Sequence, residues 1–259
     1  MSKIKISAEL SHLCPLAEVI EQASLLEDKG FYRVWVPDTV VSPWEAWLVA
    51  SLITHHTSRL NIGLGVTNPY TRHPVVMAQM ACTLQLLSNG RLTLSLGKGI
   101  ARFLEKAGIK QQEKALEECL TILRRLTNGE RTSFEGEAFR LDAVRLRTEP
   151  PKKKIPLYVA AMGPSGWETA ARIADGVSTI RGEKTDELRH RYLGDHPLPV
   201  AVLVPFSLAK PDFFPNTVRS PDGLTELITD LEKAGFDEVI VAYEGMKDLE
   251  LVAREFERR

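Results

Sequence analysis

Strand-like and helix-like segments alternate along this chain, and the alternation restricts the folds open to it more than any other feature. Residues 60–97 give the clearest example, because they read in order as strand, loop, helix and strand. The first strand is an apolar run that ends at Val66, and Pro74 opens a helix that stops at Gly90. Parallel strands need crossover segments of this kind, so the pattern predicts a parallel sheet covered by helices.

Eight such units can be counted in 259 residues, which is the size of a (β/α)8 barrel. We therefore expect an α/β fold with one domain, a TIM barrel over residues 1–259. The competing architecture is an open doubly wound sheet, which usually has a glycine-rich first turn. The first turn here, Glu9-Leu10-Ser11-His12, contains no glycine, so the barrel is the preferred prediction.

The expected boundaries follow from apolar spacing and from capping residues. The expected strands are residues 3–9, 31–36, 60–66, 91–96, 155–160, 177–180, 198–204 and 236–242. The expected helices are residues 15–28, 74–87, 111–126, 164–175, 184–192, 221–233 and 248–258, with one more beginning at the capping box Ser42-Pro43-Trp44-Glu45. Residues 132–141 break the alternation and read as a small β-hairpin excursion.

Composition and charge exclude several classes of function. The formal net charge is −1, so the sequence indicates no basic surface for nucleic acid. The apolar runs are far shorter than the roughly 20 residues of a membrane span, and the N-terminus has no signal-peptide core. Cys14, Cys82 and Cys119 are widely spaced in apolar contexts, which favours buried free thiols in the cytoplasm. No set of residues has metal-ligand spacing, so we expect no metal.

Polar and special-backbone residues follow the expected strands. In a parallel barrel these positions meet at one mouth, where sites are built. Reading them in order gives Glu9, Asp38, residues 65–74, Gly97-Lys98-Gly99, Ala161-Met162-Gly163-Pro164, Thr179, Arg181, Pro205 and Phe206. Each of them, taken alone, is better explained as a loop or capping residue.

Two kinds of chemistry are represented among these residues. Gly163-Pro164-Ser165 opens a helix, whose free N–H groups could hold an anion, and Lys98 could add a cation there. Glu9 and Asp38 could act as acid or base, or hold a polar ligand. There is no nucleophile signature. The predicted site thus has one possible phosphate-binding position and few reactive side chains. This combination favours an enzyme whose cofactor supplies the chemistry.

Three stretches together resemble the bacterial-luciferase-like family, and within it the coenzyme F420-dependent methylenetetrahydromethanopterin reductases. They are GVTNPYTRHP at residues 65–74, LSNGRLTLSLGKG at residues 87–99 and AAMGPSGWETAARIADGV at residues 160–177. The resemblance implies a TIM barrel with a deazaflavin or flavin across its C-terminal mouth. It also implies a cis peptide bond between Gly65 and Val66, bulging against the cofactor ring.

The resemblance assigns roles to the residues at the mouth. Thr67 and Asn68 would hold the polar edge of the ring. Glu9 and Asp38 match acidic positions near the ring and the substrate, and would be the catalytic residues. The remaining cofactor-binding residues would be Lys98, Ala161, Met162, Gly163, Pro164 and Thr179, with N–H groups of residues 161–163 on the phosphate.

The chain departs from the reductase pattern in two places. Ile100 stands where the reductases have a third acidic residue. The segment between Ile180 and Ser220, after the sixth strand, is abbreviated, and in the family this region helps to close the site.

Three functions remain open on the sequence alone. The first is an F420-dependent oxidoreductase that transfers a hydride to or from a small organic substrate, for which a methylene-tetrahydropterin is one candidate. The second is an FMN-dependent luciferase-like monooxygenase, and the third is a flavin-binding barrel without activity. The family also implies a homodimer formed through the helices after strands two and three. Trp44, Trp47 and Leu48 near that region are compatible with an interface or with ordinary packing.

Overall fold

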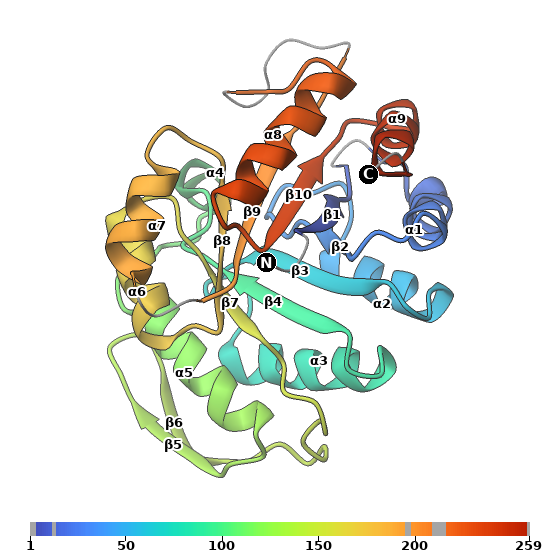
Figure 1. Cartoon of the computed structure of the whole chain (residues 1–259). Coiled ribbons are helices and arrows are strands. Elements are labelled where there is room, and N and C mark those ends of the chain that lie inside the picture. Colours follow the sequence, from blue (N-terminus) through green and yellow to red (C-terminus); the bar gives the residue numbers. More distant parts are fainter. Residues whose placement is uncertain (1–3, 12–13, 195–197, 209–215, 258–259) are drawn as a thin grey trace.

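The fold is a closed barrel of eight parallel strands surrounded by helices (Figure 1). The computed structural model describes residues 4–11, 14–194, 198–208 and 216–257. Around the barrel the strands follow the order β1-β10-β9-β8-β7-β4-β3-β2, and neighbouring strands run parallel. The barrel strands are β1 (Lys5–Glu9), β2 (Arg33–Val36), β3 (Asn61–Thr67), β4 (Leu92–Leu96), β7 (Leu157–Ala160), β8 (Gly176–Ile180), β9 (Val200–Pro205) and β10 (Glu238–Ala242). The predicted TIM barrel is confirmed.

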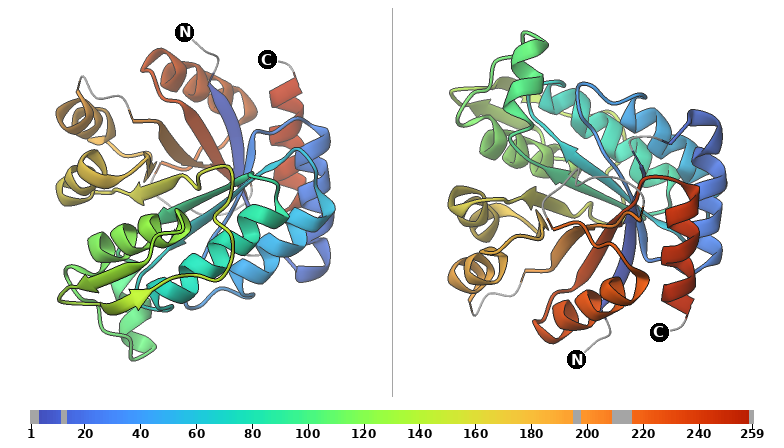
Figure 2. Two further views of the ribbon diagram at one scale, coloured as in Figure 1. Left: turned by 90° about the horizontal axis from the view of Figure 1, so that it is seen from below. Right: turned by 90° about the horizontal axis from the view of Figure 1, so that it is seen from above.

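Helices form a ring outside the strands (Figure 1), and two further views show the same helices around the barrel (Figure 2). Apolar side chains fill the layer between this ring and the barrel wall, where the largest buried cluster lies. The α-helices are α1 (Val19–Asp28), α2 (Ala46–His56), α3 (Pro74–Leu87), α4 (Ala101–Lys106), α5 (Ala115–Thr127), α6 (Pro164–Ile173), α7 (Thr185–Leu193), α8 (Pro221–Lys233) and α9 (Met246–Glu257), and a 3-10 turn η1 (Leu16–Glu18) precedes α1.

Several predicted boundaries are wrong. The capping box at Ser42 does not begin a helix, because Glu45 is the N-cap of α2 and its side chain accepts from the Leu48 N–H. Ser42 instead bonds to Thr39 within the preceding loop. The helix that was expected to begin at Gln111 begins at Ala115, as α5. The last helix, α9, begins at Met246, two residues before the expected Asp248. The expected boundaries at residues 3 and 258 lie outside the described residues, as do parts of the segment after β8.

The predicted hairpin is confirmed as a separate two-stranded sheet of β5 (Thr132–Glu135) and β6 (Arg140–Val144). Its turn is held by Glu118 of α5, whose carboxylate accepts from three successive N–H groups at residues 137–139. Phe139 also packs edge-on against His73, the N-cap of α3. The hairpin therefore lies against α5 and the start of α3, outside the barrel (Figure 2).

The amino-terminal end of the barrel interior contains a buried charged group. The Glu238 carboxylate accepts from Ser7 Oγ at 2.7 Å, Trp35 Nε1 at 2.9 Å and Arg33 Nη1 at 2.9 Å. Arg33 and Glu238 have side chains only 4% exposed. Tyr158 packs beside Trp35, with ring centroids 6.3 Å apart. These side chains fill the barrel axis below its carboxyl-terminal mouth.

Two negative findings apply to the described residues. None of their helices has the length and apolar content that crossing a membrane would require. Nor do three or more of their His, Cys, Asp or Glu side chains gather as a metal site would require. The three cysteines are buried free thiols.

Candidate active site

A cavity of about 760 Å³ opens at the carboxyl ends of the barrel strands. The structure brings ten of the twelve predicted site residues to its wall. These ten are Glu9, Asp38, Gly65, Val66, Asn68, Lys98, Met162, Gly163, Pro164 and Thr179. Thr67 and Ala161 do not line it. The floor is formed by Trp35, Leu203 and Ile240 from the barrel interior.

The end of β3 projects into this cavity. The peptide bond between Gly65 and Val66 is cis, as predicted. The pairing of β3 with β4 shifts register here, and Val66 is 39% exposed at the end of an otherwise buried strand. Gly65 leaves no room for a side chain, because a Cβ would lie 2.7 Å from Ser95 Cβ. Val66 therefore forms a ridge at the cavity wall.

Glycine is also needed opposite this ridge. A Cβ at Gly97 would lie 2.8 Å from Val66 Cγ1 and 3.1 Å from Ala160 Cβ. Real Cβ atoms essentially never approach other heavy atoms as closely as 2.8 Å, so any side chain here would displace the valine. The first glycine of the Gly97-Lys98-Gly99 motif thus leaves the space that the Val66 side chain occupies at the cavity wall.

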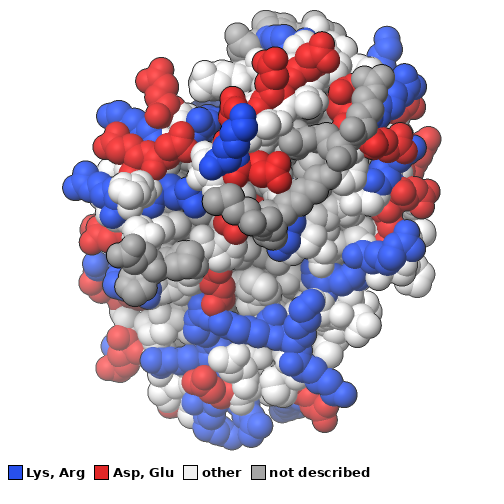
Figure 3. Space-filling view, in the orientation of Figure 1, with Lys and Arg blue, Asp and Glu red and all other residues white. Residues whose placement is uncertain are grey.

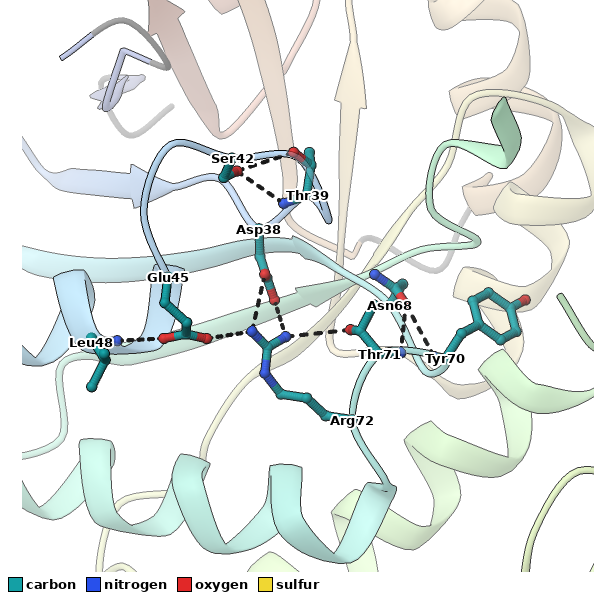
Figure 4. Close-up of polar contacts among 9 residues, drawn as sticks. All are labelled: Asp38, Thr39, Ser42, Glu45, Leu48, Asn68, Tyr70, Thr71 and Arg72. Carbon is teal, nitrogen blue, oxygen red and sulfur yellow. Dashed lines mark hydrogen bonds and ion pairs between the residues drawn. The ribbon is translucent and has the colours of Figure 1, made fainter. Parts of the chain in front are cut away.

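The loop after β3 is built around Asn68 (Figure 4). Its Oδ1 accepts from the N–H groups of Tyr70 at 3.0 Å and Thr71 at 3.1 Å, which closes a tight turn. Asn68 reaches the cavity wall, whereas the neighbouring Thr67 side chain is fully buried away from it. The Thr67 hydroxyl has no hydrogen-bond partner among the described residues. Of these two residues, Asn68 is therefore the one whose side chain can contact a ligand in the cavity.

Backbone N–H groups and a lysine lie together at the start of α6. Gly163 is its N-cap, Pro164 is its first residue, and Lys98 Nζ lies 3.5 Å from Ser165 Oγ. The N–H groups of Met162, Gly163 and Ser165 have no acceptor within the described part of the chain. The N–H of Ala161 instead donates to Ser178 O at 2.9 Å as part of the barrel ladder. Ala161 was predicted to offer this N–H to a phosphate, and the ladder bond already occupies it.

Glu9 is the last residue of β1 and is partly buried at the mouth. Burial raises the pKa of its carboxyl from 4.5 to about 8. The group therefore holds a proton at pH 7, and in that form it can donate a hydrogen bond or a proton.

Asp38 has a different environment. It follows β2 and is 7% exposed. Arg72 Nη1 donates to its Oδ2 at 2.7 Å and Nη2 donates to its Oδ1 at 3.3 Å (Figure 4). The two predicted carboxylates thus differ. Asp38 is paired with the Arg72 guanidinium, whereas desolvation raises the pKa of Glu9.

Sequence interpretation missed several residues at this site. The short helix α4 follows β4 and brings Phe103 and Leu104 to the wall, next to Ile100, which is 46% exposed. Ser95 and Ser178 also line the cavity, with their hydroxyl oxygens 2.6 Å apart. Along β4, Ser95 alternates with Leu94 and Leu96, a signal that could have assigned it to the barrel interior, but its partner on β8 could be known only from the closed barrel.

These features define an enzyme-type (β/α)8 barrel in which the N-terminus of α6 lies beside a largely apolar cavity. A family model described as luciferase-like monooxygenase matches residues 1–192. The chain belongs to this luciferase-like family, as its motifs predict.

Relatives and solved structures agree with this assignment. The chain is 35% identical over 173 residues to "F420-dependent hydroxymycolic acid dehydrogenase" of Mycobacterium tuberculosis, covering 61% of this chain and 47% of the relative. It is 32% identical over 155 residues to "5,10-methylenetetrahydromethanopterin reductase" of Archaeoglobus fulgidus, covering 59% and 46%. The matched regions thus span about half the length of these relatives.

Two solved structures share the fold. The coenzyme F420 dependent tetrahydromethanopterin reductase from Methanopyrus kandleri superposes with a TM-score of 0.81 at 20% identity, covering 98% of each chain. An F420-dependent secondary alcohol dehydrogenase in complex with an F420-acetone adduct gives a TM-score of 0.83 at 19% identity, covering 99% of this chain and 98% of that one.

Proposed function

We propose that this protein is a coenzyme F420-dependent oxidoreductase acting on a small organic substrate. The observation that carries the proposal is the arrangement of the predicted site residues on either side of the Val66 ridge. In the barrel order, β3 stands between β2 and β4. Lys98 and α6 follow β4 and β7, in one direction around the barrel from the ridge, whereas Asp38 and Glu9 lie at the ends of β2 and β1, in the other direction.

The start of α6 beside Lys98 fits the phosphate of a nucleotide-like cofactor. Free N–H groups at the start of a helix carry partial positive charge, and Lys98 adds a full one. A Cβ added at Gly163 would meet no other heavy atom within 4 Å, so the backbone there is open to a close approach. Met162, Gly163, Pro164 and Lys98 would hold the phosphate end. Gly65, Val66, Asn68 and Thr179 would contact the ring.

The chain itself contributes orientation and proton handling. Coenzyme F420, when bound, supplies a deazaflavin ring that donates or accepts a hydride. The apolar wall of Val40, Ile100 and Phe103 excludes water around the reacting groups. The protonated carboxyl of Glu9 holds the proton that a reduced oxygen or nitrogen atom of the substrate would need. Asp38 accepts hydrogen bonds from the ligand.

Cofactor binding tests the proposal directly. The affinity of the purified protein is measured for F420 and for FMN, each oxidised and reduced. Tight F420 binding with negligible FMN binding supports the proposal, whereas the reverse result favours the FMN-dependent monooxygenase. Binding without turnover of reduced F420 by any acceptor, including a methylene-tetrahydropterin, would favour the flavin-binding barrel without activity.

A matched pair of lysine variants adds a control. Lys98→Ala removes the cation beside α6, and Lys106→Ala removes an exposed lysine of α4 that does not line the cavity. We expect only Lys98→Ala to weaken F420 binding, by about tenfold. Equal effects of the two variants would count against the placement of the phosphate.

The protein is also proposed to be a homodimer in the cytoplasm. Val76, Met80 and Leu87 recur at helical spacing along one side of α3, and Val76 and Leu87 are 46% and 62% exposed. Leu48 and Leu52 of the adjacent α2 are 72% and 37% exposed. Light scattering tests the dimer, and Leu48→Glu should produce monomers if this surface pairs with a second copy. The buried free thiols support a reducing compartment.

A further inference from the structure

An arginine in the loop after β3, to which the sequence analysis assigned no role, holds the Asp38 carboxylate. Arg72 lies in the loop after β3, whereas Asp38 follows the neighbouring strand β2. The guanidinium contacts both carboxylate oxygens, at 2.7 Å and 3.3 Å (Figure 4). A two-point contact of this kind fixes the plane of a carboxylate as well as its position.

Glu45 holds the same guanidinium from a second direction. Its Oε1 contacts Arg72 Nη2, and its Oε2 accepts from the Leu48 N–H at 2.8 Å in the first turn of α2 (Figure 4). Thr71 Oγ1 lies 3.4 Å from Arg72 Nη1, and the Trp47 ring is centred 6.0 Å from the guanidinium carbon. Arg72 is therefore anchored to a helix cap behind the cavity.

Burial separates the roles of the three charged side chains. The Asp38 side chain is 8% exposed, that of Arg72 19% and that of Glu45 39%. Asp38 lines the cavity, and neither Arg72 nor Glu45 does. A ligand in the cavity would therefore meet the carboxylate and not the guanidinium.

We propose that Arg72 is a positioning residue: it presents the Asp38 carboxylate to the ligand in one orientation and is itself held by Glu45. The proposal rests on the proposed function, which gives Asp38 a ligand. One carboxylate has about four acceptor sites, and Arg72 occupies two of them. The others remain for donors on the cofactor or the substrate.

A double-variant cycle tests this role. Wild type, Arg72→Met, Asp38→Asn and the double variant are compared by three measurements: the Kd for oxidised F420, the kcat/KM with the best acceptor, and the thermal midpoint. Arg124→Met is the matched control, because Arg124 also contacts both oxygens of a carboxylate, that of Asp175 at 3.1 Å, outside the cavity.

The cycle should be strongly non-additive. Arg72→Met should change the Kd or kcat/KM in the same direction as Asp38→Asn, by about tenfold, and the double variant should be no worse than Asp38→Asn. Arg72→Met should also lower the thermal midpoint, because it leaves a buried carboxylate without its partner, and the second substitution should recover part of that loss. Arg124→Met should change only the thermal midpoint.

Three results would overturn the role of Arg72. These are additive effects in the cycle, a change confined to the thermal midpoint, and an Asp38→Asn variant with unaltered Kd and kcat/KM. Wild-type protein that binds FMN instead of F420 refutes the proposed function, and the same cycle is then measured with FMN. Wild-type protein that binds neither removes both proposals.

Discussion

The protonated carboxyl of Glu9 should make the stability of the protein depend on pH. Burial raises its pKa from 4.5 to about 8 in the folded state. Between these values the folded protein binds a proton that the unfolded chain releases. The stability that this proton contributes to the folded state is therefore fully present below pH 4.5. It declines as the pH rises from 4.5 and is lost once the pH has passed about 8.

The size of the effect follows from this interval. Inside it the free energy of unfolding falls by about 1.4 kcal/mol for each pH unit. Between pH 5 and pH 8 the loss due to this one group is about 3.5 kcal/mol, once the partial titration at both ends is included. Glu9→Gln keeps the shape of the neutral acid and can still donate and accept hydrogen bonds, but it cannot ionise, so it should remove this loss.

Urea unfolding at pH 5, 6, 7 and 8 measures the difference. Wild type should lose about 3.5 kcal/mol more than Glu9→Gln over this range, and Glu105→Gln, at an exposed position on α4, should follow the wild type. Parallel curves for wild type and Glu9→Gln would refute the reasoning, because they would show that Glu9 ionises equally in both states.

Three further predictions concern other parts of the barrel. The effect of Lys98→Ala on F420 affinity should shrink at 1 M salt, where charge interactions between exposed groups are screened, and titrations at two salt concentrations test this. Gly97→Ala should lower stability by about 1–3 kcal/mol in urea, because its Cβ overlaps Val66; an unchanged midpoint would contradict the proposed contact. Glu238→Gln should cost about 3–5 kcal/mol by leaving the Arg33 charge unpaired, and adding Arg33→Met should restore part of it; a double variant no more stable than Glu238→Gln would contradict this account.

The sequence predicted the barrel well because its evidence is local. Each strand is a short apolar run, and each helix has its own capping residues and spacing. The same locality explains the error at Ser42. The box Ser42-Pro43-Trp44-Glu45 satisfies the sequence rule for a helix start, but Glu45 contacts Arg72 on another loop and caps α2 itself. The helix therefore begins three residues later than the sequence rule predicts.

The sequence could predict which residues lie at the site, but not which of them contact one another. Strand ends and the family motifs indicated Glu9, Asp38 and the loop after β3. The Arg72 contact with Asp38 joins residues 34 positions apart, and the closed barrel is what brings them together. The helix α4 was missed because its six residues are too few for a periodic pattern. The Ala161 N–H was misassigned, since motif position does not reveal which amides the β-ladder uses.

The filled barrel axis has a consequence for how ligands reach the cavity. Arg33, Glu238, Trp35 and Tyr158 occupy the interior below the cavity, so ligands have no passage through the barrel. If the proposed function holds, the cofactor and its substrate would both enter and leave through the same open mouth.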